Sequence, residues 1–400
     1  MWLNNLRIVL PDGVLEHGSI HIEQHRIVEV VEGPGPGVHA QGHNGHLPHG
    51  HRLTAIPGII DMHGDMLERE IEPRPGAHFP FEMAVNELDK RLASNGVTTA
   101  YAAISFAEGK PRKDIRSEEH ARDIITTVNR LREGLLVDMR IHARFEVTNQ
   151  HAPPILSDLI EANQVHLISL TDHTPGQGQY RNLERYIQQM SEWRKMTSDT
   201  AEVITMERIR EAQARPPAWE VVRDITRMAP RQGLVIASHD DDTTAKVDLM
   251  ANMGVTVSEF PVTVEAAEEA RRRGMSVVMG APNAMRGVSH SGNLSALDAI
   301  ASGIVDMLAS DYHPAALLQA ALVIARRGLL PFHEAIKLIS TNAAHALGMP
   351  DHGSIVPGKC ADLALVDMTP QHLHPRVRAT FRYGSPIYLD HYVMNYAASN

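Results

Sequence analysis

The pattern of apolar and polar positions changes twice along the chain, near residue 57 and near residue 350. Between these points, short apolar runs alternate with longer stretches of helical spacing, which is typical of a parallel α/β fold. Eight of these runs are predicted to be strands: GIIDMH, VTTAYAAIS, MRIHARFEV, VHLISLTDH, LVIASHD, VTVSEFP, SVVMG and IVDMLASD. Eight strand–helix units are the number that closes a parallel barrel. Residues 58–349 are therefore predicted to form a (β/α)8 barrel of the TIM type, with a doubly wound open sheet as the alternative.

Helical stretches lie between the predicted strands. Examples are EMAVNELDKRLASN, SEEHARDIITTVNRLREG and VEAAEEARRRG. The segment 182–231 is also helical in pattern, but it is polar and longer than one barrel helix needs.

The two ends of the chain have a different texture. Residues 1–57 alternate apolar runs with turn residues such as Pro11-Asp12-Gly13, a pattern that predicts β-hairpins. The same texture returns in residues 350–400, where ADLALVD is predicted to be a strand. We therefore expect both ends to pair into one small β-sandwich domain.

Composition narrows the class of protein. Of the 400 residues, 43% are hydrophobic and 22% are charged, as in ordinary globular proteins. The single cysteine, Cys360, excludes an intrachain disulfide and a thiolate-rich zinc site, and it fits a cytoplasmic location. Neither a signal peptide nor an apolar run of membrane-spanning length is expected. The formal charge of −10 argues against a nucleic-acid partner, while a homo-oligomer stays open.

Histidine is unusually frequent, with 24 in the chain. Part of this excess lies in the segment 39–51, which is rich in Gly and Pro. We interpret it as a surface segment that binds metals adventitiously, with a role in metal loading as the alternative. Its histidines are His39, His43, His46, His49 and His51.

Polar side chains gather where the predicted strands end. In a parallel barrel, catalytic groups occupy these ends and the loops that follow. His63 and Asp65 lie on one face because side chains alternate along a strand, so they can chelate one ion. The same alternation aligns His142, Arg144 and Glu146 in another strand. Further strand ends carry Asp172, His173, His239, Asp240, Glu259, Asp311 and His313.

Imidazole and carboxylate groups without thiolates predict a site for Zn²⁺, Mn²⁺ or Fe²⁺. A divalent ion lowers the pKa of its water and polarises the bond under attack. A nearby carboxylate can then take the proton as general base. Asp311 is the candidate base, because it ends the last predicted strand, which closes the barrel beside the strand of His63.

The motifs resemble a known group of enzymes. IPGIIDMHGD, GVTTA and the late SD are similar to the amidohydrolase superfamily, although Asp65 stands where that group usually has a second histidine. The longer blocks PGIIDMHGDMLEREIEPRPG, ISLTDHTPGQ, ASHDD, VSEFPVTVEAA, VMGAPNAMRGVSHSGN and LASDYHPAALLQAA resemble the PhnM family of phosphonate metabolism. This resemblance implies hydrolysis of α-D-ribose 1-methylphosphonate 5-triphosphate to the 5-phosphate and pyrophosphate, within the carbon–phosphorus lyase pathway.

The resemblance also implies a set of metal ligands for one or two ions. With two ions, Glu146 would have to bridge them, because no lysine lies near it. Either a strand is missing from the eight, or His239 takes the fifth-strand place and Glu259 the sixth, which leaves open whether His173 or Glu259 is a direct ligand. The implied ligands are His63, Asp65, Glu146, His173, His239 and Asp311.

A small anionic, phosphorylated substrate would need cationic and amide donors. Arginine binds phosphate through two parallel hydrogen bonds, and glycine-rich turns add backbone donors. For each arginine the alternative is a surface salt bridge. The candidates are Arg74, Arg144, Asn283, Arg286 and His290.

Two other functions stay open at this stage. Most related barrels are deaminases or cyclic-amide hydrolases acting on a C–N bond, and fold alone does not separate these activities. The loop GAPNAMRGVSHSGN, rich in glycine and containing an arginine, favours phosphate over a neutral base. The other alternative is a non-enzymatic scaffold, against which stands the retention of His63, His239 and Asp311.

Overall fold

The computed structural model describes residues 1–35, 53–107, 114–214, 217, 219–289, 292–369 and 374–390. The chain divides into two compact units. Unit 1 comprises Met1–Ala102, Arg130–Arg140 and Asp306–Asn400, and unit 2 comprises Ala103–Asn129 and Ile141–Val305. The histidine-rich segment 39–51 lies outside the described residues.

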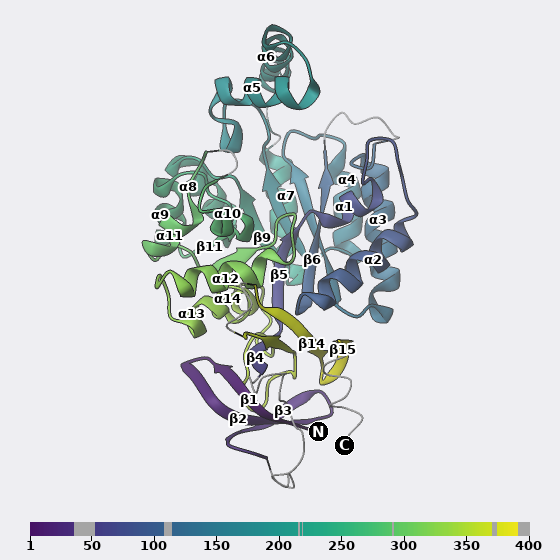
Figure 1. Cartoon of the computed structure of the whole chain (residues 1–400). Coiled ribbons are helices and arrows are strands. Elements are labelled where there is room, and N and C mark those ends of the chain that lie inside the picture. The colour runs from purple at the N-terminus through teal and green to yellow at the C-terminus, as the bar shows by residue number, and fades with distance from the viewer. Residues whose placement is uncertain are drawn as a thin grey trace. The chain divides into compact units, whose positions relative to one another are not determined.

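Eight strands form one sheet in the order β12-β11-β10-β9-β8-β7-β6-β5 (Figure 1). Its two outer members both belong to unit 1, where Gly64 forms a parallel bridge with Asp311 and the amide of Asp311 donates to the carbonyl of His63 at 3.0 Å. The sheet is thus a nearly closed parallel barrel, and the open-sheet alternative is wrong. All eight predicted strands are confirmed: β5 Ile59–Gly64, β6 Val97–Phe106, β7 Asp138–Glu146, β8 Leu167–Thr171, β9 Val235–His239, β10 Val257–Glu259, β11 Ser276–Gly280 and β12 Met307–Ala309.

The strands are buried on both faces, because side chains fill the barrel on one side and helices cover the other. In β5 and β8, for example, every residue is buried. The helices are amphipathic for the same reason: α3 buries Ala121, Ile124 and Val128 on one side.

The helices of unit 1 are α1 Met66–Ile71, α2 Phe81–Ser94, α12 Ala316–Arg326, α13 Phe332–Lys337 and α14 Thr341–Ala346. The helices lying largely in unit 2 are α3 Glu118–Leu131, α4 Ala152–Glu161, α5 Leu183–Arg194, α6 Ser198–Ala214, α7 Trp219–Met228, α8 Thr244–Asn252, α9 Val264–Arg272, α10 Ala281–Arg286 and α11 Ala296–Ala301. Short 3-10 turns occur at η1 Arg132–Gly134, η2 Gly178–Tyr180 and η3 Ala229–Gln232. No described helix is long and apolar enough to cross a membrane.

The described part of the long polar segment 182–231 contains the helices α5, α6 and α7, so it extends beyond one barrel helix, as predicted. Only α7 has the apolar face of a barrel helix, with Val222 and Ile225 buried. By contrast, α5 buries only Met190, and α6 buries only Ala201 and Thr205. Within unit 2, α5 and α6 pack together as a pair apart from α8–α11 (Figure 1).

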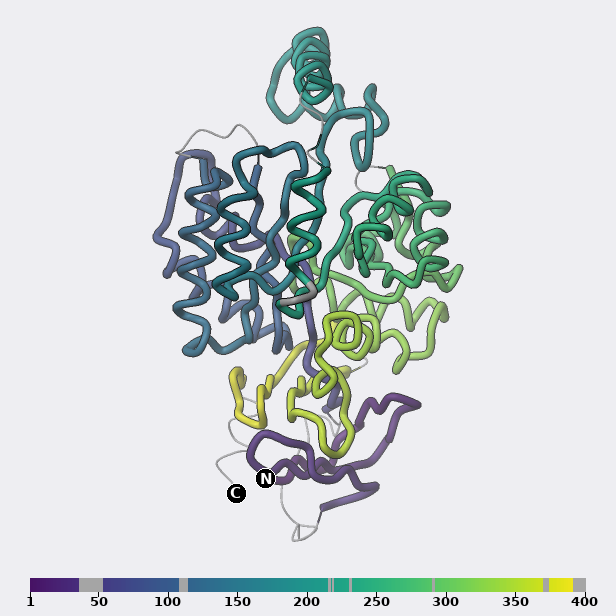
Figure 2. Tube along the Cα trace, turned by 180° about the vertical axis from the view of Figure 1, so that it is seen from behind, coloured from purple at the N-terminus to yellow at the C-terminus, as the bar shows by residue number. Residues whose placement is uncertain are grey.

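Strands from both ends of the chain form a second sheet within unit 1, of order β15-β14-β13-β4-β1-β2-β3. Early and late strands lie side by side, coloured purple and yellow in Figure 2, because β4 pairs antiparallel with β13. The pairing of the two ends is therefore confirmed, whereas the boundaries at residues 57 and 350 stay a prediction. The strands are β1 Trp2–Leu10, β2 Gly13–Glu23, β3 Arg26–Glu32, β4 Leu53–Pro57, β13 Leu363–Asp367, β14 Arg376–Arg382 and β15 Ser385–Leu389.

Candidate active site

In unit 1, three residues that were predicted as metal ligands from their positions at strand ends lie close together. His63, at the end of β5, is buried, and its Nε2 lies 3.3 Å from Oδ1 of Asp65. One ligand atom each of His63, Asp65 and Asp311 lies within 4.8 Å of the others. The backbone holds this arrangement, since the amide of Asp65 donates to the carbonyl of Asp311 at 2.6 Å. These three residues offer one nitrogen and two carboxylate groups to a cation.

A buried carboxylate supports this group from inside the barrel. Asp61 accepts hydrogen bonds from the amides of Ser310 at 3.0 Å and His63 at 3.4 Å. Burial raises the pKa of Asp61 to about 6, against the opposing effect of these hydrogen bonds. Asp61 thus ties the ends of β5 and β12 together, which orients His63 and Asp311.

In unit 2, a second group of ligand atoms lies at the ends of β8 and β9. One ligand atom each of His173, His239 and Asp240 lies within 4.8 Å of the others. Glu146, at the end of β7, orients His173, because its Oε2 lies 2.6 Å from the Nδ1 of His173. Asp240 lies 2.9 Å from the Nδ1 of His239. Burial tends to raise the pKa of Asp240, but His239, His173 and Lys246 together outweigh it and lower that pKa.

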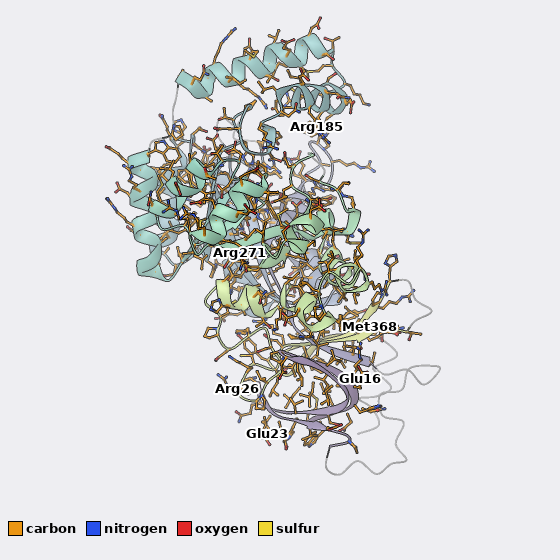
Figure 3. The ribbon with its side chains drawn as sticks, turned by 90° about the vertical axis from the view of Figure 1, so that its left-hand side faces the viewer. Glu16, Glu23, Arg26, Arg185, Arg271 and Met368 are labelled. Atoms are coloured by element: carbon orange, nitrogen blue, oxygen red, sulfur yellow. The ribbon has the colours of Figure 1, made fainter. Side chains whose placement is uncertain are left out.

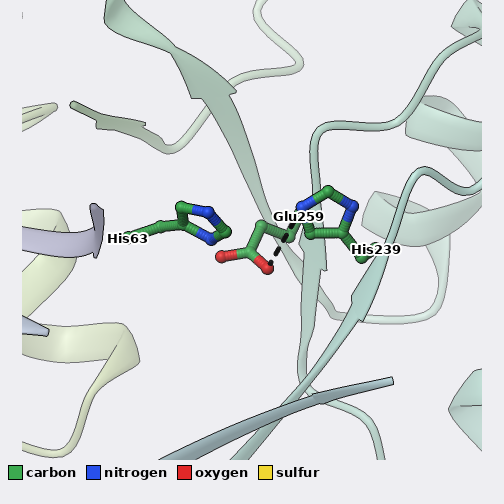
Figure 4. Close-up of side chains that lie close together, drawn as sticks. All are labelled: His63, His239 and Glu259. Carbon is green, nitrogen blue, oxygen red and sulfur yellow. Dashed lines mark ion pairs between the residues drawn. The ribbon is translucent and has the colours of Figure 1, made fainter. Parts of the chain in front are cut away.

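A fully buried carboxylate, Glu259, ends β10 in the same unit. Figure 4 shows it beside His239, with 4.0 Å between Oε2 and the imidazole Nε2, and also draws His63 of β5. The Nε2 of His142 lies 3.8 Å from the same oxygen. These separations are too long for direct hydrogen bonds, but they suit donor atoms about 2 Å from a shared cation.

The strand order shows which barrel strand each predicted ligand follows, whereas the ligand set itself stays a prediction. In the barrel, β8, β9 and β10 are the fourth, fifth and sixth strands. His239 therefore ends the fifth strand and Glu259 the sixth, while His173 follows the fourth. No strand was missed among the described residues of the barrel.

The predicted substrate residues occupy different environments. Arg144 is buried on β7, whereas Arg74 and Arg286 are exposed. Asn283 is engaged inside its own loop: its Nδ2 donates to the carbonyl of Leu294 at 3.0 Å, and its Oδ1 accepts from the amide of Ala296 at 3.1 Å. We therefore expect Asn283 to shape the loop. His290 lies outside the described residues.

Sequence reasoning missed Tyr180 in the short turn η2. Its ring lies 6.3 Å from that of His173 and 4.7 Å from that of Tyr186. Burial raises the pKa of Tyr180 to about 12, with further contributions from Tyr186 and Asp240, so its hydroxyl stays protonated. The signal in the sequence is TPGQGQY: Gly178, at φ +55°, donates its amide to Asp242 and turns the chain toward the histidines.

The predicted set of ligands also omitted His142, although the alternation of side chains along β7 places it on the same face as Glu146. Its approach to Glu259 joins residues that are far apart in the sequence. No local pattern reports such a contact.

The chain is similar to one known protein over nearly its whole length. It is 33% identical over 380 residues to the α-D-ribose 1-methylphosphonate 5-triphosphate diphosphatase of Escherichia coli K12, covering 94% of this chain and 97% of the relative. A model of the Amidohydrolase family matches residues 195–388.

Solved structures share the fold. The N-acetyl-D-glucosamine-6-phosphate deacetylase of Mycobacterium smegmatis has a TM-score of 0.64 and 15% identity, over 97% of this chain and 100% of that one. The dihydropyrimidinase of Brevibacillus agri has a TM-score of 0.60 and 14% identity, over 97% and 95% of the two chains. At such identities the likeness concerns the fold alone. The barrel, the strand-end histidines and carboxylates and the match along both whole chains agree, and the chain belongs to the α-D-ribose 1-methylphosphonate 5-triphosphate diphosphatase family of the amidohydrolase superfamily.

Proposed function

We propose that this protein is a metal-dependent hydrolase that cleaves α-D-ribose 1-methylphosphonate 5-triphosphate to the 5-phosphate and pyrophosphate in phosphonate catabolism. The observation that carries the proposal is the identity of 33% to the relative of that name over 94% of the chain. The reaction breaks the anhydride bond between the α- and β-phosphoryl groups, and water supplies the new oxygen. The cytoplasm stays the predicted location.

The donor set fits a divalent cation. Both groups of ligand atoms end strands of one parallel sheet, offer only nitrogen and oxygen, and are largely buried, a combination that suits Zn²⁺, Mn²⁺ or Fe²⁺. A bound cation would supply a Lewis acid that lowers the pKa of water and stabilises charge on a phosphoryl oxygen. We assign one or two ions to His63, Asp65, Glu146, His173, His239 and Asp311, with Glu259 as a further candidate ligand.

Side chains of this protein would orient the metal ligands and take the proton from the attacking water. We assign Asp311 as the general base, because its carboxylate lies beside His63 and Asp65 and its backbone is held by both strand ends. The nearby carboxylates of Glu146 and Asp240 hold the rings of His173 and His239 in fixed orientations.

The triphosphate would be held by cationic groups. Arg144 shares a face of β7 with Glu146, which places a guanidinium close to a proposed ligand. Arg74 and Arg286 are exposed, so a bound phosphate can reach them. His290 stays a predicted contact.

The decisive experiment identifies the products. We expect the purified protein, loaded with Mn²⁺ or Zn²⁺, to convert a ribose 5-triphosphate into pyrophosphate and a monophosphate without releasing ammonia, as followed by phosphorus NMR and an ammonia assay. Metal-loaded protein that releases ammonia from pyrimidines or opens cyclic amides, yet leaves triphosphates intact, would establish the alternative C–N hydrolase.

A further inference from the structure

An arginine on the short helix α1 of unit 1 is held by an aromatic ring and not by a carboxylate. The guanidinium carbon of Arg69 lies 5.5 Å from the centre of the Tyr312 ring. Arg69 is exposed, and its side chain forms no ion pair with any described residue. The face of a ring attracts a cation without accepting its N–H groups one by one. The charged hydrogen-bond donors of Arg69 therefore stay available to an anion.

Two acidic residues close to Arg69 in the sequence have other partners. A carboxylate oxygen of Glu70 lies 2.6 Å from a guanidinium nitrogen of Arg91. A carboxylate oxygen of Glu72 lies 3.3 Å from the Nε2 of His78. Neither carboxylate therefore compensates the charge of Arg69. A guanidinium that is fixed in place by a ring, with no carboxylate bound to it among the described residues, is suited to a negatively charged ligand.

Arg69 also lies close to the proposed metal ligands of unit 1. Asp65 is the N-cap of α1, and residues four apart on a helix lie on the same side, so Arg69 follows Asp65 by one turn. Its aromatic partner, Tyr312, directly follows Asp311 in the sequence. The contact between Arg69 and Tyr312 thus joins α1 to the loop after β12, next to the two carboxylates that are proposed to bind the ion.

We propose that Arg69 binds a phosphorus oxyanion of the substrate and that Tyr312 positions its guanidinium. This inference rests on the proposed function, which supplies a substrate of that kind. The planar guanidinium matches two oxygens of one phosphoryl group through parallel hydrogen bonds. The carboxylates of Asp65 and Asp311 repel such an anion, and a cation beside them offsets part of that repulsion. The proposed substrate carries this chemistry at two places, its triphosphate and its methylphosphonate.

Two small probes test the site and distinguish these places. In calorimetric titrations of the Zn²⁺-loaded chain, we expect Arg69→Ala to raise the dissociation constant for inorganic pyrophosphate at least about tenfold, because charged hydrogen bonds are lost. A rise for methylphosphonate alone would place Arg69 at the phosphonate end of the substrate instead. Metal content after each titration, measured by elemental analysis, should match that of the unaltered chain, because Arg69 is not a ligand. Arg69→Lys should recover only part of the affinity, since an ammonium group cannot form the paired hydrogen bonds.

The positioning role of Tyr312 has its own measurement. Tyr312→Leu should weaken binding of the same probe, and Tyr312→Phe, which keeps the ring, should restore most of the affinity.

The matched control is Arg7→Ala. Arg7 also lies 5.5 Å from the centre of a ring, that of Phe332, but it is paired at 3.0 Å with Glu16, which Figure 3 labels on the small sheet. Equal affinities of Arg69→Ala and Arg7→Ala for both probes, or an unaltered chain that binds neither probe, would overturn the proposal. Neither titration requires turnover, so this result and the identity of the reaction products fail independently.

Discussion

Three residues other than glycine adopt left-handed backbone within two residues of the end of a barrel strand. Asp240, Phe260 and Asp311 have φ of +55°, +55° and +58°. For residues other than glycine this conformation costs about 1–3 kcal/mol and tends to persist at functional sites. Asp240 and Phe260 follow His239 and Glu259, and Asp311 is itself a candidate ligand. The backbone thus turns sharply where the proposed ligands must point into one site.

The role of Asp311 as base can be separated from a role as ligand. We expect Asp311→Asn to lower kcat by roughly 10²–10⁴-fold, since the amide accepts no proton at neutral pH. Its metal content should fall much less than that of His63→Ala, measured by elemental analysis. Near-normal kcat in the Asp311→Asn variant would show that another residue is the base.

Arg286 should act mainly through substrate binding. Replacing it with alanine removes a charged hydrogen bond to a phosphate, a loss of roughly 1.5–3 kcal/mol. We therefore expect Arg286→Ala to raise KM for the triphosphate at least about tenfold. The control is Arg227→Ala, which removes an exposed arginine paired with Asp224 on α7. Equal kinetics in the two variants would remove Arg286 from the binding site.

At the scale of elements, the helix α10, which follows β11 directly, holds the connection between β11 and α11 in shape. Asn283 in α10 holds the carbonyl of Leu294 and the amide of Ala296, which begins α11. A nearby loop contact comes from Asn293, whose Nδ2 donates to the carbonyl of Gln179 at 3.4 Å. The loop that carries Arg286 is therefore tied to the loop that carries Tyr180.

Removing the Asn283 side chain should loosen this element. Asn283→Ala leaves two backbone groups without their partner, so we expect the free energy of unfolding to fall by about 1–3 kcal/mol. Hydrogen exchange in peptides covering residues 283–296 should rise, and KM should increase more than kcat falls. Asn252→Ala, at an exposed position on α8, should change the free energy of unfolding by less than about 0.5 kcal/mol. Unchanged exchange after Asn283→Ala would mean that other contacts hold the loop.

At the scale of the whole molecule, stability and chemistry rest on different residues. The strand faces opposite the proposed ligands carry fully buried apolar side chains such as Ile60, Ile141 and Ile168, which pack in the core. The proposed ligands lie at strand ends, outside this apolar packing. The fold therefore has no need of the cation for its core.

Chelation should separate the two properties. We expect treatment with a strong chelator to abolish hydrolysis while the circular dichroism spectrum stays that of the folded chain. Adding Mn²⁺ or Zn²⁺ back should restore turnover. Full activity in a preparation shown to be free of metal would overturn the proposed mechanism.

The sequence by itself determined the barrel and part of the site. Buried strands and amphipathic helices are local patterns, so all eight strands could be placed without coordinates. The grouping of His63 and Asp65 was also predictable, because alternation along a strand operates within three residues. Their meeting with Asp311 followed once the barrel was assumed to close.

Only the tertiary structure decided the contacts between distant segments. Whether His142 meets Glu259, or Tyr180 approaches His173, depends on strand register and on how loops fold over the strand ends. Asn283 stays a predicted substrate contact, and only the fold shows that its amide also holds its own loop. The pattern of α6 likewise showed a helix, and only packing revealed that Val203 and Met206 stay exposed. The physical reason is the same in each case: periodicity fixes the direction of a side chain on its own element, whereas the partner it meets is set by the packing of elements far apart in the chain.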